Sequence, residues 1–235
     1  QEAEKLKIND YMATPRKYEL NLKKRIDVNY VIILAYLLAE GHLGNTITFY
    51  NKDDNIVSEL FNCIHNTYPN LQLRKLKHKF GYIISKKIRT SKKGLRPNLL
   101  IEELKELKLH HTNSQTKFIP NCILELSNGQ IAVFLNRFFT CDGWAYKSEI
   151  AITLKSEIMI RQIQHLLLRF GIISIIKPTY KCATNTKEKK KHLYWKLYIT
   201  DNQSKRIFKE QIGFFLKYKQ DKIEITEKIN TNMDI

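Results

Sequence analysis

In LAYLLAEGHL, residues 34–43, an apolar run without charge ends on the carboxylate of Glu40 and on Gly41. Asp27 precedes the run as an N-cap, so the sequence predicts a helix over residues 28–40 with Gly41 as its left-handed stop. A carboxylate at a helix C-terminus opposes the helix dipole by ~0.3–1 kcal/mol. Either Glu40 turns to solvent, or it has a partner that offsets this penalty.

A second stretch of the same kind follows. SNGQIAVFLNRFFTCDG, residues 127–143, begins with Ser127 and Gln130, which have the spacing of a capping box, and ends on Asp142 and a glycine. Asp142 lies 142 − 40 = 102 residues after Glu40. Lysines 117 and 219 lie 117 − 40 = 77 and 219 − 142 = 77 residues after the two acids. The matching offsets predict a duplicated chain with pseudo-twofold symmetry.

The elements between these stretches repeat in order. Each half reads as helix, strand, helix, two strands and a closing helix, judged by apolar periodicity and turn residues. The closing helices are expected over residues 98–111 and 204–219, and residues 181–192 as an extended loop between two strands. We expect a lead-in or tether over residues 1–27, one unit over 28–120 and a second over 121–235.

Composition favours a polyanionic partner. Forty basic and 23 acidic residues give a formal charge of +17, and the lysines are spread over the whole chain, as in proteins that bind nucleic acid. A solubilising or membrane-surface charge is the alternative. The four cysteines lie far apart, which argues against disulfides and zinc, and the apolar stretch 30–39 is too short to span a bilayer. We expect an intracellular protein, cytoplasmic or plastid, that is not secreted and has no membrane partner.

Packing the two long helices side by side would bring Glu40 and Asp142 together. Carboxylates, with the carbonyls of Gly41 and Gly143, are the oxygen ligands that hard divalent cations prefer. Such ions activate water and stabilise the leaving oxygen in phosphodiester hydrolysis. The two lysines at the 77-residue offset would then stabilise phosphate charge or polarise water.

ILAYLLAEG and LNRFFTCDG resemble the two motif copies of LAGLIDADG homing endonucleases. Residues 11–20, 116–145 and 212–223 further resemble the endonuclease domain of inteins, most like those of replicative DNA helicases. The resemblance implies an α+β fold of two αββαββα units with saddle-shaped antiparallel sheets and a two-helix interface. It also implies a monomer that cuts a long asymmetric double-stranded DNA target with Mg²⁺, leaving 3′ overhangs, with Mn²⁺ or Ca²⁺ as substitutes for binding.

Residue by residue, the resemblance places the metal acids on Glu40 and Asp142 and the catalytic lysines on Lys117 and Lys219. Glu40 replaces the usual aspartate and adds a methylene. The small glycine of the motif becomes Ala35 in the first helix and Arg137 in the second. Arg137 fits between closely packed helices only if it turns outward from their seam.

DNA recognition is expected from strand residues that face the groove. Because side chains alternate along a strand, about half of the candidates should make contact. The candidates are Thr48, Tyr50, Lys75, Lys77, Lys79, Tyr82, Ile84, Lys86, Tyr146, Lys147, Glu149, Lys177, Thr179, Lys181, Tyr194, Lys196 and Tyr198. The lysine tract 187–191 is expected to follow phosphates. Trp144 and Trp195 are expected to pack beneath the second sheet or at its edge.

These patterns predict a single-chain DNA endonuclease whose partners are double-stranded DNA and, before excision, a host intein splicing domain. The chain has neither the nucleophilic first residue nor the terminal His-Asn of splicing, so we expect cleavage of DNA without splicing. A catalytically inactive DNA-binding relic or an RNA maturase of the same fold is the first alternative. A basic scaffold without a nucleic-acid role is the second.

Overall fold

The computed structural model describes residues 16–18, 20, 22–77, 79–87, 98–146, 148–182 and 191–225. The first half has the order α, β, β, α, β, β, α. Its elements are α1 (Val28–Glu40), β1 (Gly41–Leu43), β2 (Ile47–Tyr50), α2 (Asp54–Thr67), β3 (Leu71–Lys75), β4 (Gly81–Lys86) and α3 (Leu99–Glu106). The predicted helix over residues 28–40 is confirmed at both ends.

The second half repeats this order after a short helix. Its elements are α4 (Asn121–Leu124), α5 (Asn128–Asp142), β5 (Gly143–Tyr146), β6 (Glu149–Leu154), α6 (Glu157–Leu168), β7 (Ile175–Cys182), β8 (Lys191–Ile199), α7 (Asn202–Ile207), the π-helix η2 (Phe208–Ile212) and α8 (Lys217–Gln220). The short strands β1 and β5 were not predicted from periodicity, because three or four residues are too few to show alternation. Of the expected loop 181–192, residues 181–182 and 191–192 extend β7 and β8, and 183–190 lie outside the described residues.

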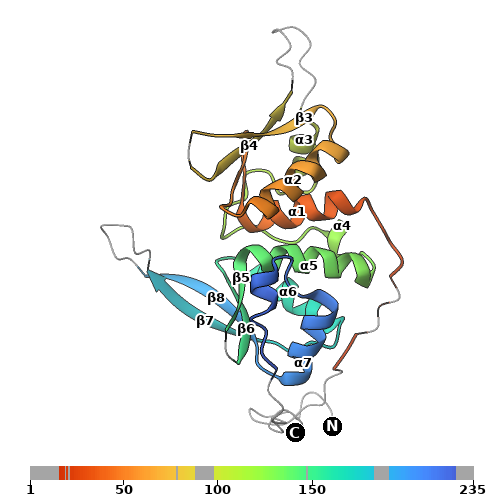
Figure 1. The fold of residues 1–235 in the computed structure, drawn as a ribbon, viewed down its shortest axis with the longest axis vertical. Helices are drawn as coiled ribbons and strands as arrows, with labels where there is room; N and C mark the ends of the chain where they lie inside the picture. The colour runs from red at the N-terminus through yellow and green to blue at the C-terminus, as the bar shows by residue number, and fades with distance from the viewer. Residues whose placement is uncertain are drawn as a thin grey trace, which may run out of the picture.

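Within the described residues the strands form two four-stranded antiparallel sheets with the same topology. The strand orders are β1-β2-β4-β3 and β5-β6-β8-β7. Figure 1 shows the two units on either side of a central pair of helices, with β7 and β8 projecting from the body. The α+β fold of two αββαββα units is therefore confirmed.

Helices α1 and α5 form the interface between the units (Figure 1). All eight residues of α1 from Val31 to Leu38 are buried, as expected for a helix that is apolar on every side. Helix α5 contributes three phenylalanines to the same core, Phe134, Phe138 and Phe139. The apolar run of the sequence thus fixes where the ends of the two helices meet.

Both helices end on a glycine for a steric reason. Gly41 has φ −82° and ψ 148°, and Gly143 has φ −92° and ψ 164°, so the predicted left-handed stop at Gly41 is wrong. A Cβ at Gly41 would lie 2.6 Å from the Leu37 carbonyl oxygen, and one at Gly143 would lie 2.7 Å from that of Phe139. Each glycine therefore lets an extended strand leave the helix end closely past its last turn.

Two further local predictions need correction. Ser127 is the N-cap of α5 but makes no capping hydrogen bond with its side chain. Gln130 instead bonds the backbone of Ile26 twice, at 3.0 and 2.6 Å. The expected closing helix 204–219 is broken, because η2 widens its last turn and Gly213 (φ 62°) reverses the chain before α8 begins.

The described part of the lead-in segment packs on the second unit before the chain enters α1. Arg16 forms an ion pair with Asp201 at 2.8 Å. The Lys24 carbonyl accepts a hydrogen bond from the Ser127 backbone amide at 2.9 Å. Residues 1–15 lie outside the described residues. Among the residues described, no helix is long and apolar enough to cross a membrane, and the four cysteines are free.

Candidate active site between the two units

Glu40 and Asp142 are the last residues of α1 and α5, the two helices that pair across the interface. The charge of Glu40 acts on the Asp142 carboxylate, and the charges of Lys117 and Lys219 act on both acids. The structure therefore brings together the four side chains predicted to form the catalytic centre. Their assembly follows from the packing of the apolar helix faces.

The two lysines hold the ends of the two helices in equivalent ways. Lys117 Nζ donates to the carbonyl oxygens of Leu37, Leu38 and Gly41 at 2.8, 2.9 and 2.7 Å. Lys219 Nζ donates to those of Thr140 and Gly143 at 2.6 and 2.9 Å. In both units the lysine reaches the motif glycine across the same 76 residues. An ammonium at a helix C-terminus also offsets the negative end of the helix dipole.

The number of bonds distinguishes the two lysines. A lysine ammonium has three N–H donors, and Lys117 uses all three on carbonyl oxygens while 4% exposed. Among the described residues, Lys219 uses two, and it lines an open cleft. Lys219 can therefore donate to a bound phosphate without giving up a helix carbonyl, and Lys117 cannot.

Burial disfavours the charged forms of the groups at this centre. It raises the pKa of Asp142 to about 7, with the Glu40 charge acting in the same direction and the two lysines opposing it. Burial also raises the pKa of Glu40, opposed by a hydrogen bond from Asn51 and by the lysines. Burial lowers the pKa of Lys117 to about 8. A cation between the two acids would offset both the burial and the mutual repulsion of the carboxylates.

The acids and carbonyls were predicted as metal ligands together. Glu40 and Asp142 fit a divalent cation, since they supply hard oxygen donors whose negative charges are uncompensated by any ion pair among the described residues. The Gly41 and Gly143 carbonyls already accept bonds from ammonium groups, which would repel an adjacent cation. No group of three or more His, Cys, Asp or Glu side chains that could hold a metal occurs in the described residues. The remaining ligands would have to be water and phosphate oxygens.

Asn51, which directly follows β2, was not among the predicted site residues. Its side-chain nitrogen donates to Glu40 Oε2 at 2.5 Å, and its oxygen accepts from the Asp53 backbone amide at 2.8 Å. The amide is thus fixed at both ends and orients one carboxylate oxygen of Glu40. A polar residue just after a strand could have marked this position in the sequence.

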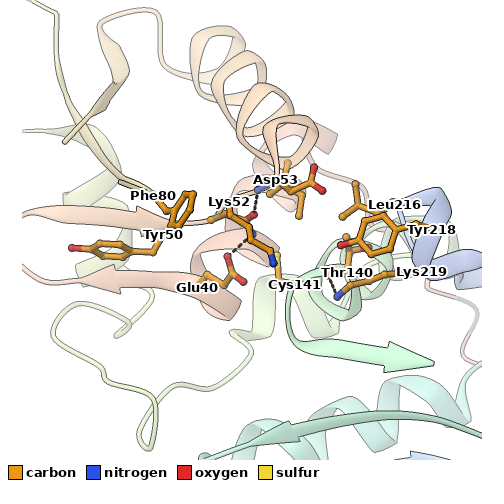
Figure 2. A pocket seen from close by; sticks show the side chains of 12 residues that line it. Glu40, Tyr50, Lys52, Asp53, Phe80, Thr140, Cys141, Leu216, Tyr218 and Lys219 are labelled. Carbon is orange, nitrogen blue, oxygen red and sulfur yellow. Dashed lines mark hydrogen bonds between the residues drawn. The ribbon is translucent and has the colours of Figure 1, made fainter. Parts of the chain in front are cut away.

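A cleft of about 380 Å³ opens beside this centre. Figure 2 shows its side chains coming from both units, with Tyr50 and Phe80 on one side and Leu216 and Tyr218 on the other. Glu40 lines the cleft together with residues of the second unit. Aromatic side chains around a carboxylate and an ammonium form a surface that suits a nucleotide strand.

The second sheet presents the predicted DNA-binding residues on a single face. Cross-strand partners share a face, and the register pairs Lys177 with Lys196 and Thr179 with Tyr194. The predicted residues on this face are Tyr146, Glu149, Lys177, Thr179, Lys181, Tyr194, Lys196 and Tyr198. Glu149 is paired with Lys196 at 2.7 Å. Lys147 lies outside the described residues, as do residues 187–190 of the lysine tract.

Trp144 belongs to the same face and was not predicted there. The ammonium groups of Lys181 and Lys196 lie 5.6 and 5.9 Å from its ring centroid. Such stacked lysines keep positive charge close to an aromatic surface. Trp195 lies on the opposite face and packs against the core, as predicted.

In the first half, four of the eight residues predicted to bind DNA lie on the core face of the sheet. Ile84 is 2% exposed and belongs to the core, so its assignment to DNA binding is wrong. The register places Lys75, Tyr82 and Lys86 on the same face as Ile84, away from Thr48 and Tyr50. Lys77 and Lys79 are exposed in the turn between β3 and β4. The residues that share the face of Thr48 and Tyr50 are His42, Gln72, Arg74, Ile83 and Ser85.

Comparison with known sequences identifies one family and several long proteins. Residues 129–213 match the profile of a family described as a LAGLIDADG-like domain. The chain is 26% identical over 239 residues to the replication factor C small subunit of Methanocaldococcus jannaschii, which covers 100% of this chain and 12% of that protein. It is 24% identical over 254 residues to the replicative DNA helicase DnaB of Synechocystis sp., covering 99% and 28%. The chain thus spans only a small part of the relatives that it matches.

Solved structures share the fold at low identity. The homing endonuclease I-DmoI in complex with DNA and Ca matches with a TM-score of 0.51 and 11% identity, covering 79% of this chain and 88% of that one. Full-length WhiA from Thermatoga maritima matches with a TM-score of 0.50 and 17% identity, covering 90% and 66%. Other I-DmoI structures with similar scores were solved in the presence of Mg or Mn. The chain therefore has the LAGLIDADG fold, and its residues 129–213 match the profile of a LAGLIDADG-like domain.

Proposed function

We propose that this protein is a LAGLIDADG homing endonuclease, which hydrolyses both strands of a long asymmetric DNA target and leaves 3′ overhangs. The observation that carries the proposal is the convergence of Glu40 and Asp142 at the paired ends of α1 and α5, each end held by a lysine. Two partly buried carboxylates with disfavoured charge are a costly arrangement for a protein that only binds DNA.

Glu40 and Asp142 would hold Mg²⁺, which supplies an activated water and stabilises the leaving oxygen of the phosphodiester. Asn51 orients Glu40 through its hydrogen bond. Lys219 donates its remaining N–H to a phosphate oxygen, and Lys117 keeps the end of α1 in place. The lysines and aromatic side chains of the second-sheet face, with the exposed Arg74 of β3 and the exposed lysines 77 and 79 of the turn after it, hold the DNA.

The intein origin is part of the same proposal. The relatives include a replication factor, a DNA helicase and an aminotransferase, which the chain matches over 12%, 28% and 17% of their lengths. Such unrelated proteins have no common activity that would explain one shared segment of about 200–250 residues. An inserted element that carries its own endonuclease would explain it.

The test uses a plasmid library of candidate targets, incubated with the protein in Mg²⁺ or in EDTA. The expected result is a linear product with 3′ overhangs in Mg²⁺ only. Glu40→Gln and Asp142→Asn should each abolish cleavage and leave DNA affinity, measured in Ca²⁺, within about tenfold, because they remove metal ligands and leave the groove contacts.

Each other outcome selects an alternative. Salt-dependent DNA binding without cleavage in Mg²⁺ would identify a catalytically inactive DNA-binding relic. Tight binding of a structured intron RNA in place of DNA would identify a maturase. The absence of salt-dependent binding to either nucleic acid would leave a basic scaffold.

A further inference from the structure

Three side chains that are not predicted ligands interlock across the interface. The Arg137 guanidinium on α5 donates to both carboxylate oxygens of Glu59 on α2, through Nε at 3.0 Å and Nη2 at 2.6 Å. The Tyr36 hydroxyl on α1 donates to Glu59 Oε2 at 2.5 Å. Arg137 and Glu59 are each 18% exposed. These residues, called the clamp below, join the second unit to two helices of the first.

The clamp lies close to the acids along both helices. Tyr36 is four residues before Glu40, and Arg137 is five residues before Asp142. At 1.5 Å per residue, these separations correspond to about 6 and 7.5 Å along the helix axes. A bidentate ion pair has a fixed geometry, so the clamp opposes sliding of α1 past α5 about one turn from the carboxylates.

The clamp also contacts the segment that carries the second lysine. The Phe215 ring centroid lies 4.5 Å from the Arg137 guanidinium carbon. The Phe215 backbone amide donates to Thr140 Oγ1 at 2.7 Å, and α8 with Lys219 follows two residues later. Arg137 thus contacts both Phe215, in the segment before Lys219, and Glu59 of the first unit.

The duplication shows that this contact belongs to one unit only. The residue 102 positions before Arg137 is Ala35, which is fully buried. An arginine at a helix interface is expensive unless it is paired with good geometry. Replacing a small residue there by an arginine therefore requires Glu59, and the pair adds a directional bond that an apolar contact lacks.

We propose that Tyr36, Glu59 and Arg137 are positioning residues that set the axial register of α1 against α5, so that Glu40 and Asp142 act on one metal-bound DNA. The inference rests on the proposed function. It implies that loss of the clamp uncouples the two strand cuts, because the acids no longer face each other in every molecule. DNA binding remains, since the sheet faces lie elsewhere.

The experiment compares Arg137→Gln, Glu59→Gln, Tyr36→Phe and the charge swap of Glu59→Arg with Arg137→Glu in the complete chain. The matched control is Arg161→Gln, which breaks the exposed pair of Arg161 and Glu157 on α6. Three quantities are measured: the nicked and linear fractions of a target plasmid, DNA affinity in Ca²⁺, and Mn²⁺ affinity by electron paramagnetic resonance. Thermal unfolding shows which variants are folded.

Arg137→Gln and Glu59→Gln should weaken Mn²⁺ binding by about tenfold, equivalent to a loss of ~1.4 kcal/mol, and accumulate nicked plasmid. DNA affinity should stay within about threefold, and the charge swap should recover most of the Mn²⁺ affinity. Tyr36→Phe, which removes one hydrogen bond, should show the same changes to a smaller extent and serves if the other variants do not fold. Folded variants with wild-type Mn²⁺ affinity, or a swap that recovers nothing, would overturn the inference. If the wild type cuts no target, the proposed function fails, and Mn²⁺ affinity still tests the clamp.

Discussion

Replacing Asp142 by Asn should make the metal-free protein more stable at neutral and alkaline pH, although Asp142 is a predicted catalytic residue. Burial and the Glu40 charge raise the pKa of Asp142 from an ordinary 3.8 to about 7. Among the described residues, no hydrogen-bond donor reaches its carboxylate. A group whose pKa is higher in the folded state binds its proton more tightly there, so stability is present below pH 3.8 and is lost as the pH rises towards 7.

The pKa difference sets the size of the effect. A pKa difference of one unit corresponds to about 1.36 kcal/mol, so a pKa raised from 3.8 to about 7 corresponds to at most ~4 kcal/mol of unfolding free energy. Asp142 is partly exposed, and screening by solvent reduces the expected difference in unfolding free energy to about 2 kcal/mol. For a chain of this length the unfolding temperature should rise by about 4–8 °C in Asp142→Asn at pH 8. The difference should become small near pH 4, where the folded-state carboxylate is protonated and the unfolded-state carboxylate is about half protonated.

The assay is thermal unfolding in EDTA from pH 4 to pH 8.5, repeated with Mg²⁺. Bound metal stabilises the wild type by RT ln(1 + [L]/Kd), which is about 2.7 kcal/mol at a hundredfold excess over Kd. The order of stability should therefore reverse at high Mg²⁺.

Asp201→Asn is the control of opposite sign. Burial alone would raise the pKa of Asp201, but hydrogen bonds from Ser204 and the charge of Arg16 outweigh burial and lower this pKa. That variant should lose stability above pH 4. An Asp142→Asn protein less stable than wild type in EDTA at pH 8 would refute the reasoning.

Three further changes test separate parts of the molecule. Lys117→Met should lower the free energy of unfolding by about 2 kcal/mol in a urea titration, because three helix carbonyls lose a charged donor; an unchanged midpoint would contradict this. Gly143→Ala should cost about 1–3 kcal/mol by the same measurement, since its Cβ would meet the Phe139 carbonyl at 2.7 Å. Lys177→Gln should reduce the slope of log affinity against log salt by about one, whereas Lys105→Gln on α3 should leave it unchanged.

Much of the frame could be predicted because it depends on apolar periodicity and on the repeat. Eight consecutive buried residues in α1 leave no ambiguity about a core helix. The 77-residue offset predicted the two lysines, and the structure gives both the same kind of bond to the motif glycine carbonyl. The predicted residues of the second sheet share one face, because lysines and tyrosines alternate there with apolar residues over long strands.

The remaining details depend on contacts that no local pattern contains. In the first sheet β4 reads YIIS, two apolar residues in a row, so a register error of one residue moved the predicted contacts to the core face. Gln130 has the spacing of a capping box, but the Ile26 backbone, 104 residues away, competes for it. The break at Gly213 follows from a π-helical turn and from a Gln220 side chain that returns to the Phe214 amide at 2.8 Å.

The duplication therefore constrains the backbone more strongly than the side chains at the centre. Asn51 orients Glu40 through its side-chain amide. The strand register gives Leu154 as its counterpart in the second unit, since Gly41 pairs with Phe49 and Gly143 with Ile152, and a leucine side chain has no donor. Lys117 has its three donors occupied by helix carbonyls, whereas Lys219 uses two. Equivalent helix ends thus carry one acid held by an amide beside a saturated lysine, and one acid without a donor beside a lysine with an N–H to spare. Under the proposed function, a symmetric backbone with unequal side chains suits an asymmetric DNA target, because each half would bind different bases while the two acids act at one centre.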